Sequence, residues 1–365
     1  MRILVANPYL KGRERLVDEG LYPRHHLWGA DALLDAGHEI DYVKEQPNPK
    51  LDRLSKKLGY RFGDIAFEKA VLKQAKEVDL LYAPAGSYFR VPLRRAQGKL
   101  ACRLITWRYA PPAAPNYRKL RNLSSRSRIE GAYDGIACLT SRTELFYRAF
   151  YPHINAQYIP WTVDEQLFQP SSKAGNYAFA CGRTCRDHET IARASRLTDC
   201  PIIVLAPREA SRFYEDPPQN LRVVWGPDSA EDDKGIPYKN LVEYLQGAAF
   251  SIIALKPAFT TAGYTNLLES LRMGLPVVMT KGADLDINVE NDGLGLAFEE
   301  GDAEDLARQI NTMRTTAHMR RSAVLDYYQA STSAEDFGNR IVKFVNSVAD
   351  RQEHPESKRQ GSLCH

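Results

Sequence analysis

A loop of small residues that runs into a helical pattern, within residues 260–280, has the composition of an anion-binding site. Unpaired N–H groups and the positive end of the dipole at a helix N-terminus bind phosphate. Gly263 would let a ligand approach the backbone closely, and Glu269, about one turn further on, could accept from two adjacent ribose hydroxyls. An ordinary strand-to-helix turn with an exposed Glu269 is the alternative. The candidate contacts here are Thr261, Gly263, Tyr264, Thr265, Asn266 and Glu269.

The run GRTCRDH, residues 182–188, follows an apolar segment that is typical of a buried strand. Arg183 and Arg186 would then lie just past a strand end, where charge-assisted hydrogen bonds could neutralise a diphosphate. Each such bond contributes on the order of 1.5–3 kcal/mol, and micromolar binding needs about 8 kcal/mol. The alternative is a structural salt bridge from one of the two arginines to Asp187 or Glu189.

Short apolar runs alternate with helical patterns along the whole chain, as they do in parallel sheets that helices cover on both faces. In the first half, strands are predicted at 2–6, 39–43, 79–83, 103–107 and 135–139, and helices at 26–36 and 62–77. In the second half, strands are predicted at 177–181, 201–206, 221–225, 250–255 and 276–280. Helices are predicted there at 187–196, 238–247, 264–273 and 302–313.

The pattern predicts an α/β fold with two doubly wound, Rossmann-like domains that face each other across a cleft. We expect one domain over 1–160, joined by a C-terminal helix at about 333–350, and a second over 165–330. The polar tail, 351–365, is expected to be disordered. Ligands of such sheets bind beyond the C-terminal strand ends, so the cleft is the expected site.

A basic stretch without a single Asp or Glu extends from Leu80 to Ile129. It carries Arg90, Arg94, Arg95, Lys99, Arg103, Arg108, Arg118, Lys119, Arg121, Arg126 and Arg128. Such a field attracts anions, including lipid headgroups and phosphates. Nucleic acid is disfavoured because no nucleic-acid-binding module accompanies the charge. A solvated basic surface without a partner is the alternative.

The composition is that of an ordinary globular protein, with 44% hydrophobic residues, 26% charged residues and a net charge of +4. No apolar run approaches the roughly 18 residues that span a bilayer. The N-terminus lacks the small-residue cleavage site of a signal peptide, so we expect the protein in the cytoplasm. The six cysteines form no C-x-x-C pair and are expected to be reduced thiols.

Four ordered segments of the second half resemble GT-B fold glycosyltransferases of family 4. They are Gly182-Arg183, the run from Thr261 through Glu269 to Val278, the interdomain run Tyr158–Pro170, and the closing segment 291–307. The resemblance covers about 155–315 well and the first half only weakly, through its opening strand and residues 36–40. It implies transfer of a sugar from a nucleoside diphosphate sugar with retention of configuration and without an essential metal or cofactor.

The resemblance also implies roles for the candidate residues. Arg183 and Arg186 would hold the diphosphate, next to Gly182, whereas His188 stands where the family usually has a lysine and is a weaker candidate. Gly263, Thr265 and Asn266 would cradle phosphate and Glu269 would bind ribose. The nucleobase would contact the loop after strand 221–225 and the region near Tyr238, with a UDP- or GDP-linked sugar as the expected donor.

Two departures from the family pattern keep other functions open. Thr261 replaces the first acid of the E-x₇-E segment, and no histidine follows the fourth strand of the first half. A non-catalytic nucleotide-sugar-binding protein, which Thr261 suggests, is therefore an alternative. A nucleotide-sugar epimerase, which shares the two-domain architecture, is another alternative, although the acid-free basic stretch of the first half argues against it.

The first half is expected to hold the acceptor. The loop Asn7–Arg24 leaves the first strand toward the cleft, and His25 or His26 could act on the acceptor, although an ordinary helix N-terminal histidine is the alternative. With the basic stretch, this half would meet an anionic acceptor or a membrane surface. The acceptor could be a lipid-linked sugar or a cell-envelope glycan intermediate. We therefore expect the protein in the cytoplasm, either free there or bound peripherally to the inner face of the membrane.

Overall fold

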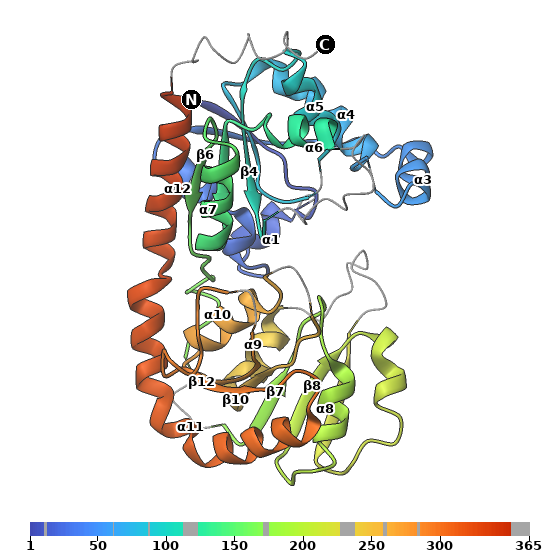
Figure 1. Ribbon diagram of the computed structural model, residues 1–365, viewed down its shortest axis with the longest axis vertical. Coiled ribbons are helices and arrows are strands. Elements are labelled where there is room, and N and C mark those ends of the chain that lie inside the picture. Colours follow the sequence, from blue (N-terminus) through green and yellow to red (C-terminus); the bar gives the residue numbers. More distant parts are fainter. Residues whose placement is uncertain are drawn as a thin grey trace.

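The computed structural model consists of two lobes, one above the other in Figure 1. It describes residues 1–10, 13–60, 62–86, 88–111, 123–170, 175–226, 238–257, 261–282 and 285–351. The tail beyond 351, residues 112–122 of the basic stretch and the linker residues 171–174 lie outside the described residues. So do residues 227–237, which include most of the loop after the strand at 221–225 that was expected to contact the nucleobase.

The first lobe is built on a six-stranded sheet in the order β2-β1-β3-β4-β5-β6, with every pairing parallel. Its strands are β1 (Arg2–Val5), β2 (Glu39–Tyr42), β3 (Leu80–Ala83), β4 (Arg103–Arg108), β5 (Gly135–Cys138) and β6 (Asn155–Tyr158). The five predicted strands are confirmed. The edge strand β6 was not predicted, because its sequence NAQY is mostly polar.

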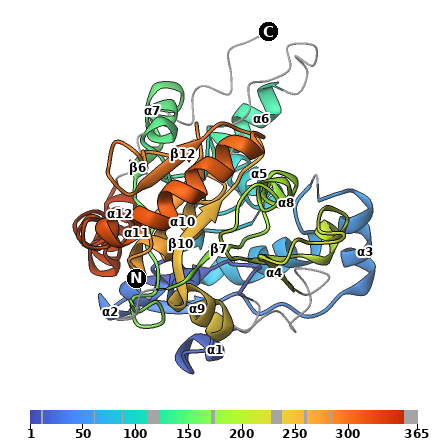
Figure 2. The same ribbon diagram turned by 90° about the horizontal axis from the view of Figure 1, so that it is seen from below.

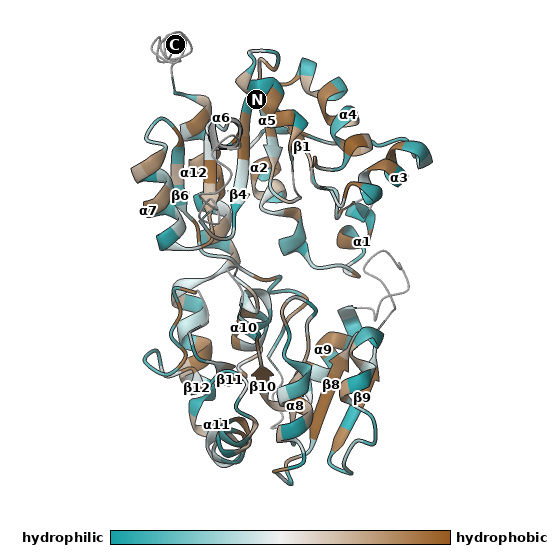
Figure 3. Cartoon of the chain, turned by 45° about the vertical axis from the view of Figure 1, so that its right-hand side comes forward, coloured by the Kyte–Doolittle hydropathy of each residue, from teal (hydrophilic) through white to brown (hydrophobic). Residues whose placement is uncertain are grey.

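The second lobe repeats this architecture in the order β12-β11-β10-β7-β8-β9, again with every pairing parallel. Its strands are β7 (Tyr177–Ala180), β8 (Ile202–Ala206), β9 (Leu221–Trp225), β10 (Ala248–Ile253), β11 (Val277–Thr280) and β12 (Gly295–Phe298). Apolar strands such as β8 and β10 lie inside this lobe (Figure 3). Two Rossmann-like α/β units are thus confirmed.

The helices cover both sheets. In the first lobe they are α1 (Glu14–Asp18), η1 (Arg24–Leu27), α2 (Ala30–Asp35), α3 (Pro49–Lys57), α4 (Ile65–Gln74), η2 (Ala75–Glu77), α5 (Arg90–Ala96), α6 (Leu123–Glu130) and α7 (Ser141–Phe150). In the second they are α8 (His188–Ala194), η4 (Arg208–Phe213), α9 (Tyr238–Gln246), α10 (Tyr264–Arg272) and α11 (Ala303–Ser331). Helix α11 packs against α8, α10 and β10 (Figure 2).

The helix predicted over 26–36 is interrupted in its middle. Trp28 (φ 58°) and Gly29 (φ 79°) adopt left-handed backbone conformations and separate η1 from α2. A Cβ at Gly29 would lie 2.9 Å from the side chain of Ile341, so the break lets another helix approach closely. That helix is α12 (Ala334–Ala349), which leaves the second lobe and packs against α2, β4 and β5 of the first (Figure 1).

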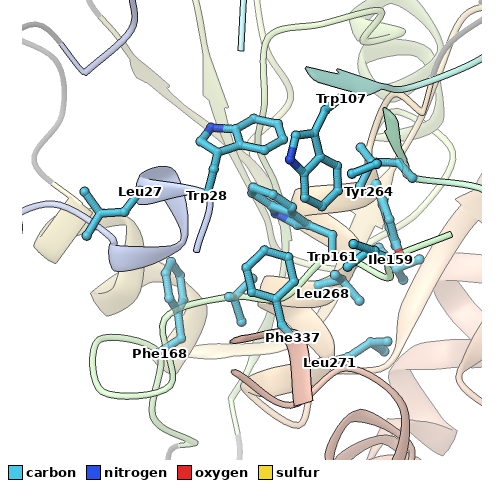
Figure 4. Packing of buried hydrophobic residues seen from close by; sticks show 14 of the residues in the cluster. Leu27, Trp28, Trp107, Ile159, Trp161, Phe168, Tyr264, Leu268, Leu271 and Phe337 are labelled. Carbon is cyan, nitrogen blue, oxygen red and sulfur yellow. The ribbon is translucent and has the colours of Figure 1, made fainter. Parts of the chain in front are cut away.

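An apolar cluster joins the two lobes. Trp161, in the connection between the sheets, lies 4.3 Å from Trp28 and 5.5 Å from Phe337 of α12, measured between ring centroids. Tyr264 and Leu268 of α10 complete the cluster from the second lobe (Figure 4). This packing joins the connection between the sheets to α10 and α12.

Candidate functional site

The loop after β7 is built around the Arg186 side chain. Its Nε donates to the Cys181 carbonyl and its Nη1 to the Thr184 carbonyl, both at 2.8 Å, and its Nη2 donates to Asn266 of α10. Gly182 (φ +112°) faces this guanidinium, and a Cβ there would lie 2.2 Å from Nη2. The glycine is required by the arginine, and the loop is thereby tied to α10.

Asn266 and Glu269 extend this network into α10. The Asn266 amide donates to Glu269 Oε2 at 3.1 Å and contacts Cys181 Sγ at 3.2 Å. Glu269 is only 3% exposed, so the interpretation of an exposed glutamate is wrong. Burial raises the pKa of Glu269 to about 8, against the opposing effects of the Asn266 hydrogen bond and the Arg186 charge.

The acceptors of Arg186 are Cys181, Thr184 and Asn266, and not Asp187 or Glu189, which the alternative of a structural salt bridge named. Asp187 instead caps α8, accepting from the N–H and the hydroxyl of Thr190 at 3.2 and 2.6 Å. Arg183 is exposed beside this loop, at the C-terminal end of β7. The two arginines therefore differ in burial, with Arg186 half-buried and Arg183 exposed.

The N-terminus of α10 follows Gly263, as predicted. Gly263 has φ +83°, and a Cβ there would lie 2.9 Å from the Ile253 side chain, so the residue is restricted by conformation and by space. Thr261 precedes it, with its carbonyl accepting from the Tyr264 N–H at 3.3 Å, and Thr265 is half-buried. Tyr264 corrects one expectation, because its side chain is buried in the cluster between the lobes and is not presented to a ligand (Figure 4).

His188 is also placed differently from a phosphate ligand. It is 8% exposed, its Nδ1 lies 2.9 Å from the Tyr214 hydroxyl, and its Nε2 is buried without a hydrogen-bond partner. Burial and then the charge of Arg186 lower the pKa of His188 to about 4. The imidazole is therefore neutral near pH 7, and it contacts Tyr214 at the end of η4.

The first lobe reaches the site through the segment before α2. His26 Nε2 lies 2.8 Å from the hydroxyl of Tyr238, the first residue of α9, and the Tyr22 ring makes an edge contact with Tyr238 at 5.3 Å. Burial and then the charge of Arg13 lower the pKa of His26 to about 4. Tyr238, expected near the nucleobase, thus contacts the opposite lobe, and burial raises its pKa well above the usual value.

His25 has a structural position, as the alternative for these two histidines proposed. It is 4% exposed, and its Nδ1 accepts from the Asp164 N–H of the interdomain segment at 3.0 Å. Burial and the neighbouring His26 lower the pKa of His25 well below its usual value. A second contact between the lobes joins Ser141 of α7, through its N–H and hydroxyl, to the Asp286 carboxylate at 2.7 and 2.6 Å.

The basic stretch is less exposed than its sequence suggests. Arg95 and Arg103 pair with Asp134 at 2.8 and 3.1 Å, and Arg108 pairs with Glu130 at 2.8 Å. Both acids lie just beyond the stretch, so a search for acids within it misses them. The exposed cations among its described side chains are Arg90, Arg94, Lys99 and Arg128.

A cavity of about 550 Å³ lies elsewhere, between η1, α2, the interdomain segment and the start of α12. None of the predicted donor-site residues lines this cavity. The carboxylates of Glu45, Asp52 and Asp64 lie close enough together to coordinate a metal ion. This cluster is remote in sequence from the donor-site candidates. In the described part of the chain, no helix is long and apolar enough to cross a membrane.

Comparisons with known proteins identify the fold. No protein-family model and no curated protein matches the sequence. Sucrose-phosphate synthase from Thermosynechococcus elongatus superposes with a TM-score of 0.67 at 14% identity, over 95% of this chain and 99% of its own. The chain has the GT-B fold. A glycosyltransferase from Rickettsia africae ESF-5 also superposes on this chain, with a TM-score of 0.61 at 13% identity, over 96% of this chain and 99% of its own.

The GT-B protein HepE of Anabaena, solved in complex with UDP and glucose, matches with a TM-score of 0.60 at 13% identity, over 95% of this chain and 99% of its own. At such identities the likeness establishes the fold alone. The likeness therefore assigns no role to Arg183, Asn266 or Glu269.

Proposed function

We propose that this protein is a glycosyltransferase, which transfers a sugar from a UDP- or GDP-linked donor to an acceptor hydroxyl with retention and without an essential metal. The observation that carries the proposal is the network of Arg186, Asn266 and Glu269, which joins the loop after β7 to α10 beside the α10 N-terminus. Both elements lie at the C-terminal ends of strands, where such sheets bind ligands. The UDP and glucose bound to the structurally similar HepE agree with this choice of donor.

The proposed division of labour follows the two lobes. The lobe over 165–330 would bind the nucleotide sugar, and the lobe over 1–160, with the helix at 333–350, would bind the acceptor. The hydrogen bond between His26 and Tyr238 joins the two lobes, so substrates bound beside it on the two lobes would lie close together. Such proximity is what transfer between two bound substrates requires.

In the proposed mechanism, no side chain forms a covalent bond with the substrate. The bond between the anomeric carbon and the diphosphate oxygen breaks, the acceptor oxygen bonds to the anomeric carbon on the same face, and the acceptor proton passes to the departing phosphate oxygen. Arg183, the fixed charge of Arg186 and the N-terminus of α10 would stabilise the charge that grows on the diphosphate. Glu269 would bind the ribose hydroxyls.

The acceptor is proposed to be anionic or associated with a lipid or the cell envelope, with the protein in the cytoplasm or peripheral at the inner membrane face. The exposed Arg90, Arg94, Lys99 and Arg128 support this, although three other arginines of the stretch are ion-paired. Liposome sedimentation with and without anionic lipid tests it. Equal, negligible binding to both would reject a membrane acceptor.

One observation favours a second candidate, a non-catalytic nucleotide-sugar-binding protein. Thr261 has no carboxylate to place near the donor sugar. Slow hydrolysis of a donor sugar by the purified protein separates the two, because a protein that only binds the donor releases no free sugar.

The first experiment is a thermal-shift panel of UDP, GDP, ADP and dTDP sugars. A ligand at 100 times its Kd stabilises the folded protein by about 2.7 kcal/mol. With the donor known, Arg183→Ala should lower turnover roughly 100-fold or more, as does the loss of one preorganised donor. Arg193→Ala, an exposed arginine on α8, is the control. Unchanged binding and turnover in Arg183→Ala would reject the assignment.

A further inference from the structure

Lys256 lies beside the loop after β7, although it belongs to the segment that follows β10. Its backbone N–H donates to the Cys185 carbonyl at 2.8 Å. The Asp187 N–H in turn donates to the Ala254 carbonyl at 3.0 Å. An isolated antiparallel bridge lies between these two hydrogen bonds. The two segments are thus joined along their length, and Lys256 is an exposed cation at the same edge as Arg183.

Two cationic candidates of the loop after β7, Arg186 and His188, are held by protein contacts. The Arg186 guanidinium has five N–H groups, and its three nitrogen atoms each donate to a protein acceptor. These hydrogen bonds allow the Arg186 side chain to hold the loop on α10 as well as to contact a ligand. His188 is buried against Tyr214 and is neutral near pH 7. Among these loop residues, exposed positive charge comes from Arg183 and Lys256.

The Lys256 ammonium lies over the Phe213 ring and near the buried His188 imidazole. Its Nζ lies 5.6 Å from the centroid of the Phe213 ring, a cation–π distance, and Phe213 belongs to η4, which follows β8. The charge of Lys256 also contributes to the low pKa of His188, which places the two groups near each other. The ammonium therefore lies near the segments that follow β7, β8 and β10 at their C-terminal ends.

We propose that Lys256 is a diphosphate-binding residue of the donor site, which acts with Arg183 in place of the buried His188. The proposal rests on the proposed function, since it assumes a nucleoside diphosphate in this site. An ammonium binds phosphate as a compact point charge and needs no fixed geometry, so a long side chain from a neighbouring loop can serve. Because charge grows on the leaving diphosphate, this contact should strengthen during transfer.

The test is calorimetric binding of UDP, GDP and their nucleosides to the full chain and three variants. Lys256→Ala removes the charge and Lys256→Arg keeps it. Lys281→Ala is the matched control: Lys281 follows β11, the strand beside β10, but its Nζ is paired with Glu299 at 2.6 Å. Melting temperatures of all variants report on folding, and we expect them to be nearly unchanged because both lysines are exposed.

We expect Lys256→Ala to weaken binding of the diphosphate that the wild-type chain recognises by about tenfold or more. Nucleoside binding should change less than twofold, and Lys256→Arg and Lys281→Ala should keep most of the diphosphate affinity. Three results would overturn the inference while leaving the proposed function intact. They are an unchanged diphosphate affinity in Lys256→Ala, an equal loss of diphosphate affinity in Lys281→Ala, and a loss of diphosphate affinity that the nucleoside affinity shares. A wild-type chain that binds neither UDP nor GDP would overturn both.

Discussion

The substitution Glu269→Gln tests the buried carboxyl group directly, through the pH dependence of stability. The pKa of Glu269 is about 8 in the folded protein, against 4.5 for an ordinary glutamate. Between these values the unfolded chain has released the proton and the folded protein retains it. The free energy of unfolding therefore falls by about 1.4 kcal/mol per pH unit as pH rises. From pH 5 to pH 7 this single group would lower wild-type stability by roughly 2–3 kcal/mol.

Glutamine does not titrate, and its carbonyl can still accept from Asn266. We expect Glu269→Gln and the wild type to have similar stability at pH 5, with the variant more stable by roughly 2 kcal/mol at pH 7. Urea unfolding at the two pH values measures this difference, and Glu189→Gln, at an exposed position of α8, is the control. The reasoning fails if the stability gap between Glu269→Gln and wild type is the same at both pH values, or narrows toward pH 7.

The remaining predictions concern the glycine, the contact between the lobes and the ion pairs of the first half. Gly182→Ala should displace the Arg186 guanidinium and lower both the melting temperature and nucleotide affinity, the latter several-fold, because a Cβ would lie 2.2 Å from Nη2. Tyr238→Phe should cost about 1 kcal/mol in urea unfolding by removing the hydrogen bond to His26. Asp134→Asn should cost about 2 kcal/mol or more in the same assay, since it leaves two half-buried arginines without their anion.

Much of the fold followed from the sequence, because parallel strands buried on both faces are continuous apolar runs. Ten strands were predicted on this basis, although the edge strand β2, EIDY, is not buried on either face. The two strands that were missed, β6 and β12, also lie at sheet edges. Helix interruptions were harder. The break at Trp28 and Gly29 depends on Ile341, more than 300 residues further on, and no local pattern reports such a contact.

The candidate site shows the same limit. Backbone features such as the left-handed Gly182 and Gly263 could be predicted, since a loop that meets a helix N-terminus needs them. Side-chain partners could not, because they come from distant segments. Asn266 holds Arg186 from another strand-helix connection, and the Tyr264 side chain, at the start of α10, is buried in the core. Lys256 follows a predicted strand, so the rule that singled out Arg183 could have found it.

The protonation of Glu269 also bears on the charge that a donor would meet. With a pKa of about 8, this carboxyl is mostly neutral at pH 7, so the nearby Arg186 charge is not compensated and attracts a diphosphate. Above pH 8 the carboxylate forms beside the same site and repels it. UDP-glucose has no ionising phosphate in this range, so its affinity should fall as pH rises from 7 to 9, and Glu269→Gln should remove most of that fall. An affinity of the wild type that is constant over this interval would show that Glu269 does not ionise near the diphosphate.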